Sequence, residues 1–120
     1  MNIIRKEQVK KELLPGRFLQ KCIGKESYSE SGRLSFGFAT YCAEAGPMQP
    51  HRHAEEIVYI LNADRTWVRF GSSEQKLEDK VSLETGMILH IPEKEWHVFE
   101  YEQGGFLEIL FIYGQTEGIR

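Results

Sequence analysis

The sequence predicts a single all-β domain. Short runs rich in β-branched and aromatic residues recur along the chain, and clusters of Gly, Asn, Asp and Ser separate them. No long stretch shows the 3.6-residue period of an amphipathic helix; residues 6–14 are expected to form a short one that ends at Pro15-Gly16. Strands at this close spacing favour an antiparallel sandwich or barrel.

The predicted strands follow from composition and alternation. Residues 34–42 (LSFGFATYC) alternate, with large apolar side chains on one face. Residues 56–61 (EIVYIL) and 65–70 (RTWVRF) form the next two strands, and residues 62–64 (NAD) between them have the composition of a hairpin turn. The series is completed by residues 81–83, 87–91, 96–101 and 106–113.

Composition narrows the class of protein. With 120 residues, 41% hydrophobic and 28% charged, the chain is long enough for one domain with its own core. Its net charge of −3 gives no electrostatic reason to expect a nucleic acid or an anionic membrane as partner. Cys22 and Cys42 form no zinc-binding spacing and are expected to be reduced.

The N-terminal stretch MNIIRKEQVKKELL is too charged for a signal peptide, and no apolar run approaches the roughly 20 residues that span a bilayer. We therefore expect a cytoplasmic protein.

Two histidines one residue apart are the first sign of a functional site. In the segment HRHAEE, His51 and His53 would share one face of an extended chain, and two carboxylates follow at once. A third histidine, His97, follows a glycine, a short predicted strand and Pro92 in the segment GMILHIPEKEWH.

This pattern resembles the cupin superfamily. The first cupin motif corresponds here to Gly46, four residues, His51-Arg-His53, two residues, Glu56, six residues and Ala63. The second motif reads Gly86, five residues, Pro92-Glu-Lys94, two residues, His97, three residues and Tyr101. The resemblance covers roughly residues 34–113.

The resemblance implies an all-β double-stranded β-helix, which is a jelly-roll-like barrel. Residues 34–113 would form the barrel core, and residues 1–33 a short N-terminal extension with the first strand. The metal ligands implied by the two motifs are His51, His53, Glu56 and His97.

The choice of carboxylate stays open between two neighbours. The first motif is one residue short before its acid, so Glu55 and Glu56 are both candidates. Glu56 directly precedes the IVYIL strand, where the family's ligand sits, whereas strand parity places Glu55 on the face of His51 and His53. A bulge at the shortened turn would favour Glu56.

Three imidazoles and a carboxylate suit one divalent transition metal, namely Fe, Mn, Ni, Co, Cu or Zn. We expect a metal-dependent enzyme of the dioxygenase, isomerase, lyase or decarboxylase type, acting on a small carbohydrate- or carboxylate-like substrate. A non-catalytic binding or sensing module is the alternative. Candidates for an additional acid or base are Tyr59, His90, Tyr101 and Glu108.

The sequence also predicts assembly. Residues 1–24 lie outside both motifs and carry apolar side chains that need cover. Open sheets have edges that a second subunit can protect, and twofold dimers are the commonest soluble assembly. We therefore expect a homodimer with sheet-to-sheet contacts that use the N-terminal segment.

Overall fold

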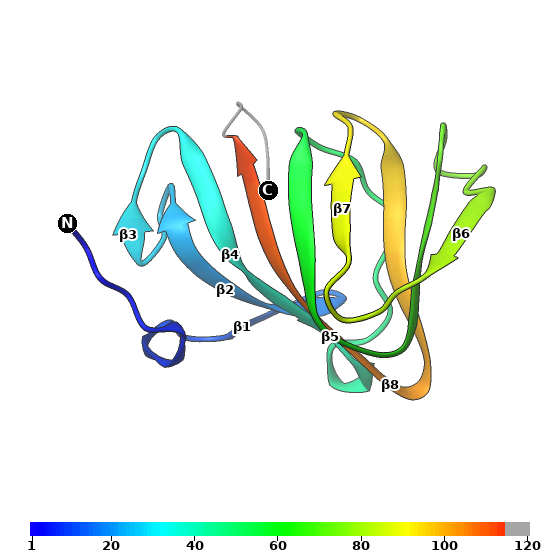
Figure 1. Ribbon diagram of the computed structural model, residues 1–120, viewed down its shortest axis with the longest axis horizontal. Helices are drawn as coiled ribbons and strands as arrows, with labels where there is room; N and C mark the ends of the chain where they lie inside the picture. The colour runs from blue at the N-terminus through cyan, green and yellow to red at the C-terminus, as the bar shows by residue number, and fades with distance from the viewer. Residues whose placement is uncertain (115–120) are drawn as a thin grey trace.

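The computed structural model describes residues 1–114, and the chain over this range is built almost wholly of β-strands (Figure 1). The prediction of an all-β protein is confirmed. Two 3-10 turns, η1 (Lys6–Gln8) and η2 (Ala43–Ala45), are the helical elements of the described residues. The strands are β1 (Glu12–Leu14), β2 (Arg17–Gly24), β3 (Ser29–Glu30), β4 (Leu34–Tyr41), β5 (Glu56–Gly71), β6 (Asp79–Ser82), β7 (Ile88–Ile91) and β8 (Trp96–Gly114).

The strands form one connected sheet that bends back on itself. Its order is β1-β2-β4-β8-β5-β6, with β3 beside β2 and β7 beside β5, and all pairs except β2–β3 are antiparallel. The two longest strands, β5 and β8, pair with each other along most of their length. Figure 1 shows both strands bending at the bottom of the view, so that the sheet rises on either side of the bend.

The bend replaces a predicted hairpin. The sequence favoured a turn at residues 62–64, but Asn62 pairs with Glu108 and Asp64 with Phe106, so β5 continues through this segment. Register shifts flank the segment, and Arg65, which lies within the second of them, has a positive φ of 56°. Turn-like residues here make bulges, which leave residues unpaired and increase the local twist of a strand.

The predicted helix over residues 6–14 is wrong. Only η1 is helical, and β1 pairs with β2 across a tight turn at Pro15 and Gly16, whose φ of +88° suits glycine. The amide of Gln20 donates to the carbonyl oxygens of Lys6 and Val9, at 3.0 and 2.9 Å. These bonds fix the segment against β2. Residues 12–30 therefore contribute three strands, whereas the sequence predicted one.

The core is apolar and almost completely closed to solvent. Val58, Ile60, Val98, Leu107 and Ile109 are each at most 1% exposed. Burial of each such side chain contributes about 1.5–3 kcal/mol relative to exposure. The domain therefore has its own source of stability, apart from any bound ion. Within residues 1–114, no helix is long and apolar enough to cross a membrane.

Candidate metal centre

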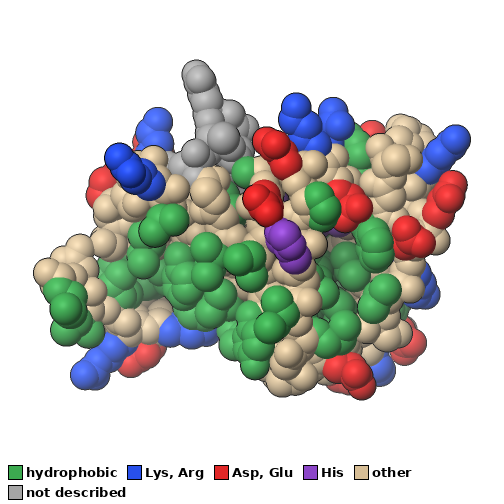
Figure 2. Space-filling model, turned by 45° about the horizontal axis from the view of Figure 1, so that its top comes forward, with side chains coloured by type: hydrophobic (Ala, Val, Ile, Leu, Met, Phe, Trp, Pro, Cys, Tyr) green, Lys and Arg blue, Asp and Glu red, His purple; other side chains and the backbone are tan. Residues whose placement is uncertain are grey.

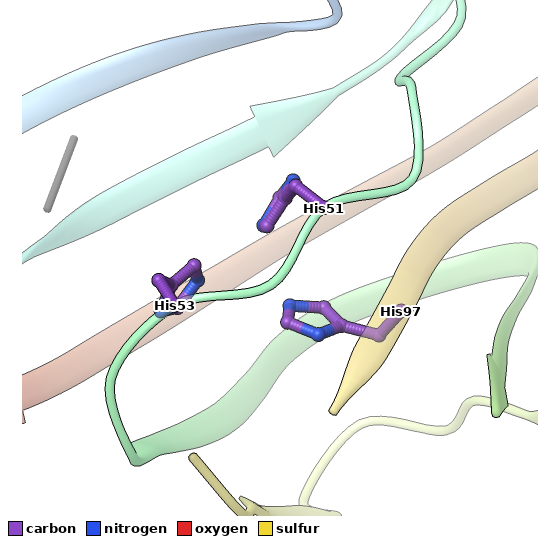
Figure 3. A group of neighbouring side chains, drawn as sticks. All are labelled: His51, His53 and His97. Carbon is purple, nitrogen blue, oxygen red and sulfur yellow. The ribbon is translucent and has the colours of Figure 1, made fainter. Parts of the chain in front are cut away.

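Three histidines converge between the two sides of the bent sheet. His51 and His53 lie on the segment before β5, and His97 is the second residue of β8. Two backbone hydrogen bonds of 3.0 Å join the two segments, since His51 and His97 each donate an N–H to the carbonyl of the other. Figure 3 shows the three rings turned toward one another. One ring nitrogen from each lies within 4.8 Å of the other two.

Backbone carbonyls orient two of these rings. Nδ1 of His53 lies 3.1 Å from the carbonyl oxygen of Ala54, and Nδ1 of His97 lies 3.0 Å from that of Glu95. A carbonyl oxygen only accepts, so each Nδ1 carries the proton in these bonds. Each Nε2 is then left with its lone pair, which is the form that coordinates a metal.

The carboxylate of Glu56 joins the histidines. Its side chain is 2% exposed, and Oε1 lies 3.2 Å from Nε2 of His53 and 3.9 Å from Nε2 of His97. With bonds of about 2.0–2.2 Å, neighbouring ligand atoms of one metal lie about 3.0–3.5 Å apart. The distance between Glu56 and His53 falls in this range.

Glu55 points away from the cluster. Its carboxylate pairs with Nε2 of His90, and both side chains are about two-thirds exposed. The alternation of side chains along a strand does not apply between His53 and Glu55, because residues 52–55 are not in a strand and β5 begins at Glu56. Glu56 pairs with Ile91 of β7 and Tyr113 of β8, which fixes its orientation.

The turn before β8 also supports this arrangement. Lys94 donates its backbone N–H to the carbonyl oxygen of His53, at 2.8 Å. Lys94 has a positive φ of 67° at the position where the cupin motif has glycine. The backbone conformation of the motif is therefore kept without the residue that adopts it most easily.

The donor set fits a divalent metal. A neutral His53 and an ionised Glu56 direct acceptor atoms at each other over 3.2 Å, an arrangement that is stable when a proton or a cation lies between them. Imidazole nitrogens with one carboxylate oxygen suit Fe, Mn, Ni, Co, Cu and Zn. The burial of Glu56 agrees with this, because buried carboxylates are paired or coordinate metals.

Aromatic and apolar residues surround the centre. The Tyr113 ring is 5.6 Å from that of His53, and the Phe99 ring is 6.1 Å from that of His97, measured between centroids. A cavity of about 240 Å³ adjoins His97, with β5, β6 and β7 supplying most of its wall. Its apolar wall residues include Val68, Phe70, Val81, Leu89 and Ile91.

The four further acid–base candidates lie elsewhere. Tyr59 is 39% exposed and alternates with the inward-facing Val58, and His90 is exposed beside Glu55. Glu108 faces outward and forms an ion pair of 2.8 Å with Lys6.

Tyr101 lies four residues along β8 from His97, a separation of about 13 Å in a strand. Its hydroxyl lies 2.8 and 3.0 Å from the carbonyl oxygens of Cys42 and Gly46 and donates to them. Burial raises the pKa of this hydroxyl, which keeps it a donor. The structure thus gives Tyr101 a role in anchoring η2. None of the four candidates belongs to the histidine cluster, and of the four only His90 borders the cavity beside His97.

Sequence reasoning missed the residues that line the centre, namely Phe70, Leu89, Phe99 and Tyr113. Alternation from a known ligand identifies one of them, since Phe99 is two residues from His97 on the same face. Cross-strand pairing links two of the others to the ligands, since Phe70 lies opposite His97 and Tyr113 opposite Glu56, and Leu89 lies opposite Val58 of β5. No local feature of the sequence predicts these pairs.

Comparison of the sequence with models of protein families and with curated proteins finds no match. Solved structures do match. The polyketide cyclase RemF from Streptomyces resistomycificus is 21% identical with a TM-score of 0.68; the match covers 95% of this chain and 79% of RemF. The DMSP lyase DddQ from Ruegeria pomeroyi DSS-3 is 16% identical with a TM-score of 0.73, over 95% of this chain and 60% of DddQ.

A third structure, Fe(II)-HppE with an alternative substrate, is 13% identical with a TM-score of 0.70, over 94% of this chain and 60% of HppE. The chain thus spans about three-fifths of the length of DddQ and of HppE. At these identities the likeness establishes the fold. All three neighbours have the cupin fold, and the predicted jelly-roll-like barrel is confirmed.

Proposed function

We propose that this cupin-fold chain binds one divalent transition metal through His51, His53, Glu56 and His97, and acts on a small organic molecule. The observation that carries the proposal is the convergence of three imidazoles, two of them oriented by backbone carbonyls, and one buried carboxylate. When bound, Fe, Mn, Ni, Co, Cu or Zn would supply Lewis acidity or, in the case of iron, redox chemistry.

The cavity beside His97 favours an apolar body in the substrate. A site of about 150 Å³ holds benzene, so about 240 Å³ accommodates roughly ten non-hydrogen atoms. The hydroxyls of a sugar would need many hydrogen-bond partners, whereas most of the wall is apolar and its polar lining residues are His90, Glu95 and His97. Of the two substrate classes that we considered, a carboxylate-like molecule with a hydrocarbon portion fits better than a carbohydrate.

An enzyme of the dioxygenase, isomerase, lyase or decarboxylase type is the first reading. It is supported by analogy with neighbours described as a cyclase and a lyase. A binding or sensing module is the second reading, and a specific observation favours it: Tyr59, Tyr101 and Glu108 lie away from the histidines, and His90, which borders the cavity, is paired with Glu55.

Metal content and unfolding temperature of a His53→Ala variant test the proposal. We expect about one metal ion per chain in the wild-type protein and a strongly reduced content in the variant. Because the core is apolar and closed, the variant should remain folded. His90→Ala is the matched control, since this exposed ring lies away from the centre and should leave the metal content unchanged.

An unfolded His53→Ala protein would indicate a structural metal, and an unchanged metal content would refute the assignment. To separate enzyme from binder, the metal-loaded protein is incubated with small carboxylates. Product formation that a chelator abolishes supports the enzyme, whereas metal-dependent binding without product supports the sensing module.

We further propose that the protein is cytoplasmic and binds neither nucleic acid nor membranes. The net charge of −3 gives no electrostatic attraction for a nucleic acid. The proposal further includes a homodimer, which involves a different surface of the chain.

A further inference from the structure

The cavity beside His97 has one acidic wall residue, Glu95, that the function proposed above does not use. The other polar residues of the wall have partners of their own, since His97 belongs to the histidine cluster and His90 is paired with Glu55. Within residues 1–114, the carboxylate of Glu95 takes part in no ion pair and no hydrogen bond. Glu95 is therefore available to recognise part of a bound molecule.

The turn before β8 directs Glu95 toward the cavity. Its carbonyl oxygen accepts the 3.0 Å hydrogen bond from Nδ1 of His97, and its N–H donates to the carbonyl oxygen of Pro92 over 3.3 Å. These two bonds hold its backbone in place. Glu95 is partly buried and belongs to the cavity wall, whereas Glu93 and Lys94 in the same turn are exposed and do not.

Basic side chains do not offset the charge of this acid. Among the described residues, the wall of the cavity contains no Lys or Arg. Lys80 alternates with the wall residue Val81 on β6, and its ammonium lies over the ring of Trp67, 4.4 Å from the centroid. Asp79 shares the face of Val81 and lies opposite Phe70, so a second acid borders the wall.

The surface around the exposed histidine is acidic as well. Figure 2 shows acidic side chains gathered around the histidine that is visible on this view, while Lys and Arg side chains lie mostly toward the outline of the molecule. Charges of one sign that line a cleft attract ligands of the opposite sign. The side chains at the cavity therefore favour a cation over an anion.

A ligand that fills the cavity displaces water from Glu95. Removing a carboxylate from water is costly unless an opposite charge and hydrogen-bond donors replace the water. A protonated amine supplies both, because it carries a positive charge and up to three N–H donors. A carboxylate in the same place would repel Glu95 and leave both groups without a partner. The wall thus selects for an ammonium group and against an acid.

We propose that the cavity binds a small molecule with a hydrocarbon chain and a protonated amine, and that Glu95 determines this specificity. Together with the proposed function, on which this part rests, the inference identifies the substrate class as an amino carboxylate. A divalent metal keeps one positive charge after pairing with Glu56, which the carboxylate of the substrate neutralises, and Glu95 neutralises the ammonium. A dicarboxylate would leave its second acid facing Glu95.

Ligand binding to the metal-free protein tests the role of Glu95 separately from the metal. Hexylammonium and hexanol are matched probes, because they have the same hydrocarbon chain and differ in the charge at its end. In NMR titrations near neutral pH, hexylammonium should bind at least about tenfold more tightly than hexanol, since hydrogen bonds between charged groups are stronger than neutral ones.

Glu95→Gln should reduce this preference to within about twofold. Glu93→Gln is the matched control, because it removes the same charge from an exposed position of the same turn and should keep the full preference. Thermal unfolding checks that the variants are folded, and Glu95→Ala provides a second test of the position. Equal or absent binding of the two probes to the wild type would overturn the proposal. A preference that persists in Glu95→Gln and Glu95→Ala would overturn it as well, because another acid would then hold the ammonium.

Three further probes extend the test to the metal-loaded protein, namely 6-aminohexanoate, hexanoate and adipate. The first should bind more tightly than hexanoate, and adipate should bind more weakly; adipate binding as tightly as 6-aminohexanoate would contradict the substrate class. Failure of the proposed function has a different signature. A wild-type protein that binds no metal but prefers hexylammonium would retain the role of Glu95 and lose the metal centre. A metal-loaded protein without that preference would retain the centre and lose the role of Glu95.

Discussion

Replacing Glu56 by glutamine tests whether this carboxylate is a metal ligand, and Glu55→Gln is its matched control. The two substitutions remove the same charge from neighbouring positions. Glu56 is 2% exposed and faces His53 and His97, whereas the exposed Glu55 pairs with His90. Only the first substitution should therefore weaken metal binding.

The expected magnitude follows from burial. Removing one partner of a buried charged pair costs about 3–5 kcal/mol. At about 3 kcal/mol, the metal dissociation constant of Glu56→Gln rises about 150-fold. At a metal concentration of about 100 times the wild-type dissociation constant, the metal stabilises the wild type by about 2.7 kcal/mol and the variant by about 0.3 kcal/mol.

Thermal unfolding with and without metal measures this difference. For a chain of this length, about 1 kcal/mol corresponds to about 4 °C in Tm, so metal should raise Tm by about 10 °C in the wild type and in Glu55→Gln. In Glu56→Gln the rise should be only about 1 °C. Without metal, Glu56→Gln should be no less stable than the wild type, because it removes a buried charge. A full metal-induced rise in Glu56→Gln, together with its loss in Glu55→Gln, would refute the reasoning and identify Glu55 as the ligand.

Two further predictions concern stability. Lys94→Gly should raise the free energy of unfolding by about 0.5–1 kcal/mol, because it relieves a positive φ of 67°. Thermal unfolding of the metal-free protein measures this change. A loss of stability would show that contacts of the lysine side chain outweigh the backbone strain. Hydrogen bonds from Arg69, and secondarily from Trp67, lower the pKa of Glu100. The contribution of the ionised Glu100 to folding stability is therefore fully present above about pH 4.3, and it is lost as the pH falls through the lower pKa of the folded state. In urea unfolding, Glu100→Gln should be about 1 kcal/mol less stable than the wild type at pH 7 and equal to it near pH 2; a constant difference would contradict the pairing.

The histidine positions were predictable because their chemistry is local. His51 and His53 are one residue apart, and His97 has a fixed spacing from Gly86 and Pro92. The structure brings the three rings together as the motifs implied. Most strands were predictable for a similar reason, since alternation records which side chains face the interior.

The choice between the two carboxylates was not predictable from local sequence. Both follow His53 closely, and what separates them is where β5 begins. That point is fixed by pairing with Ile91 and Tyr113, which lie 35 and 57 residues beyond Glu56. The errors at residues 62–64 and 6–14 have the same origin. Pairing with β8 makes a bulge from residues that otherwise suit a turn, and the Gln20 side chain holds the N-terminal segment in place of a helix.

The alternation of β5 has a consequence for how this protein can change. Glu56 and Val58 belong to the interior, while Ile57 and Tyr59 belong to the exposed face of the sheet. A substitution at one of these positions alters one face of the strand and leaves the other intact, so the interior and the outer surface can diverge independently among descendants of this chain. Insertion or deletion of a single residue within β5 would exchange the two sets and place isoleucine where the carboxylate stands. This strand should therefore tolerate replacements but keep its length.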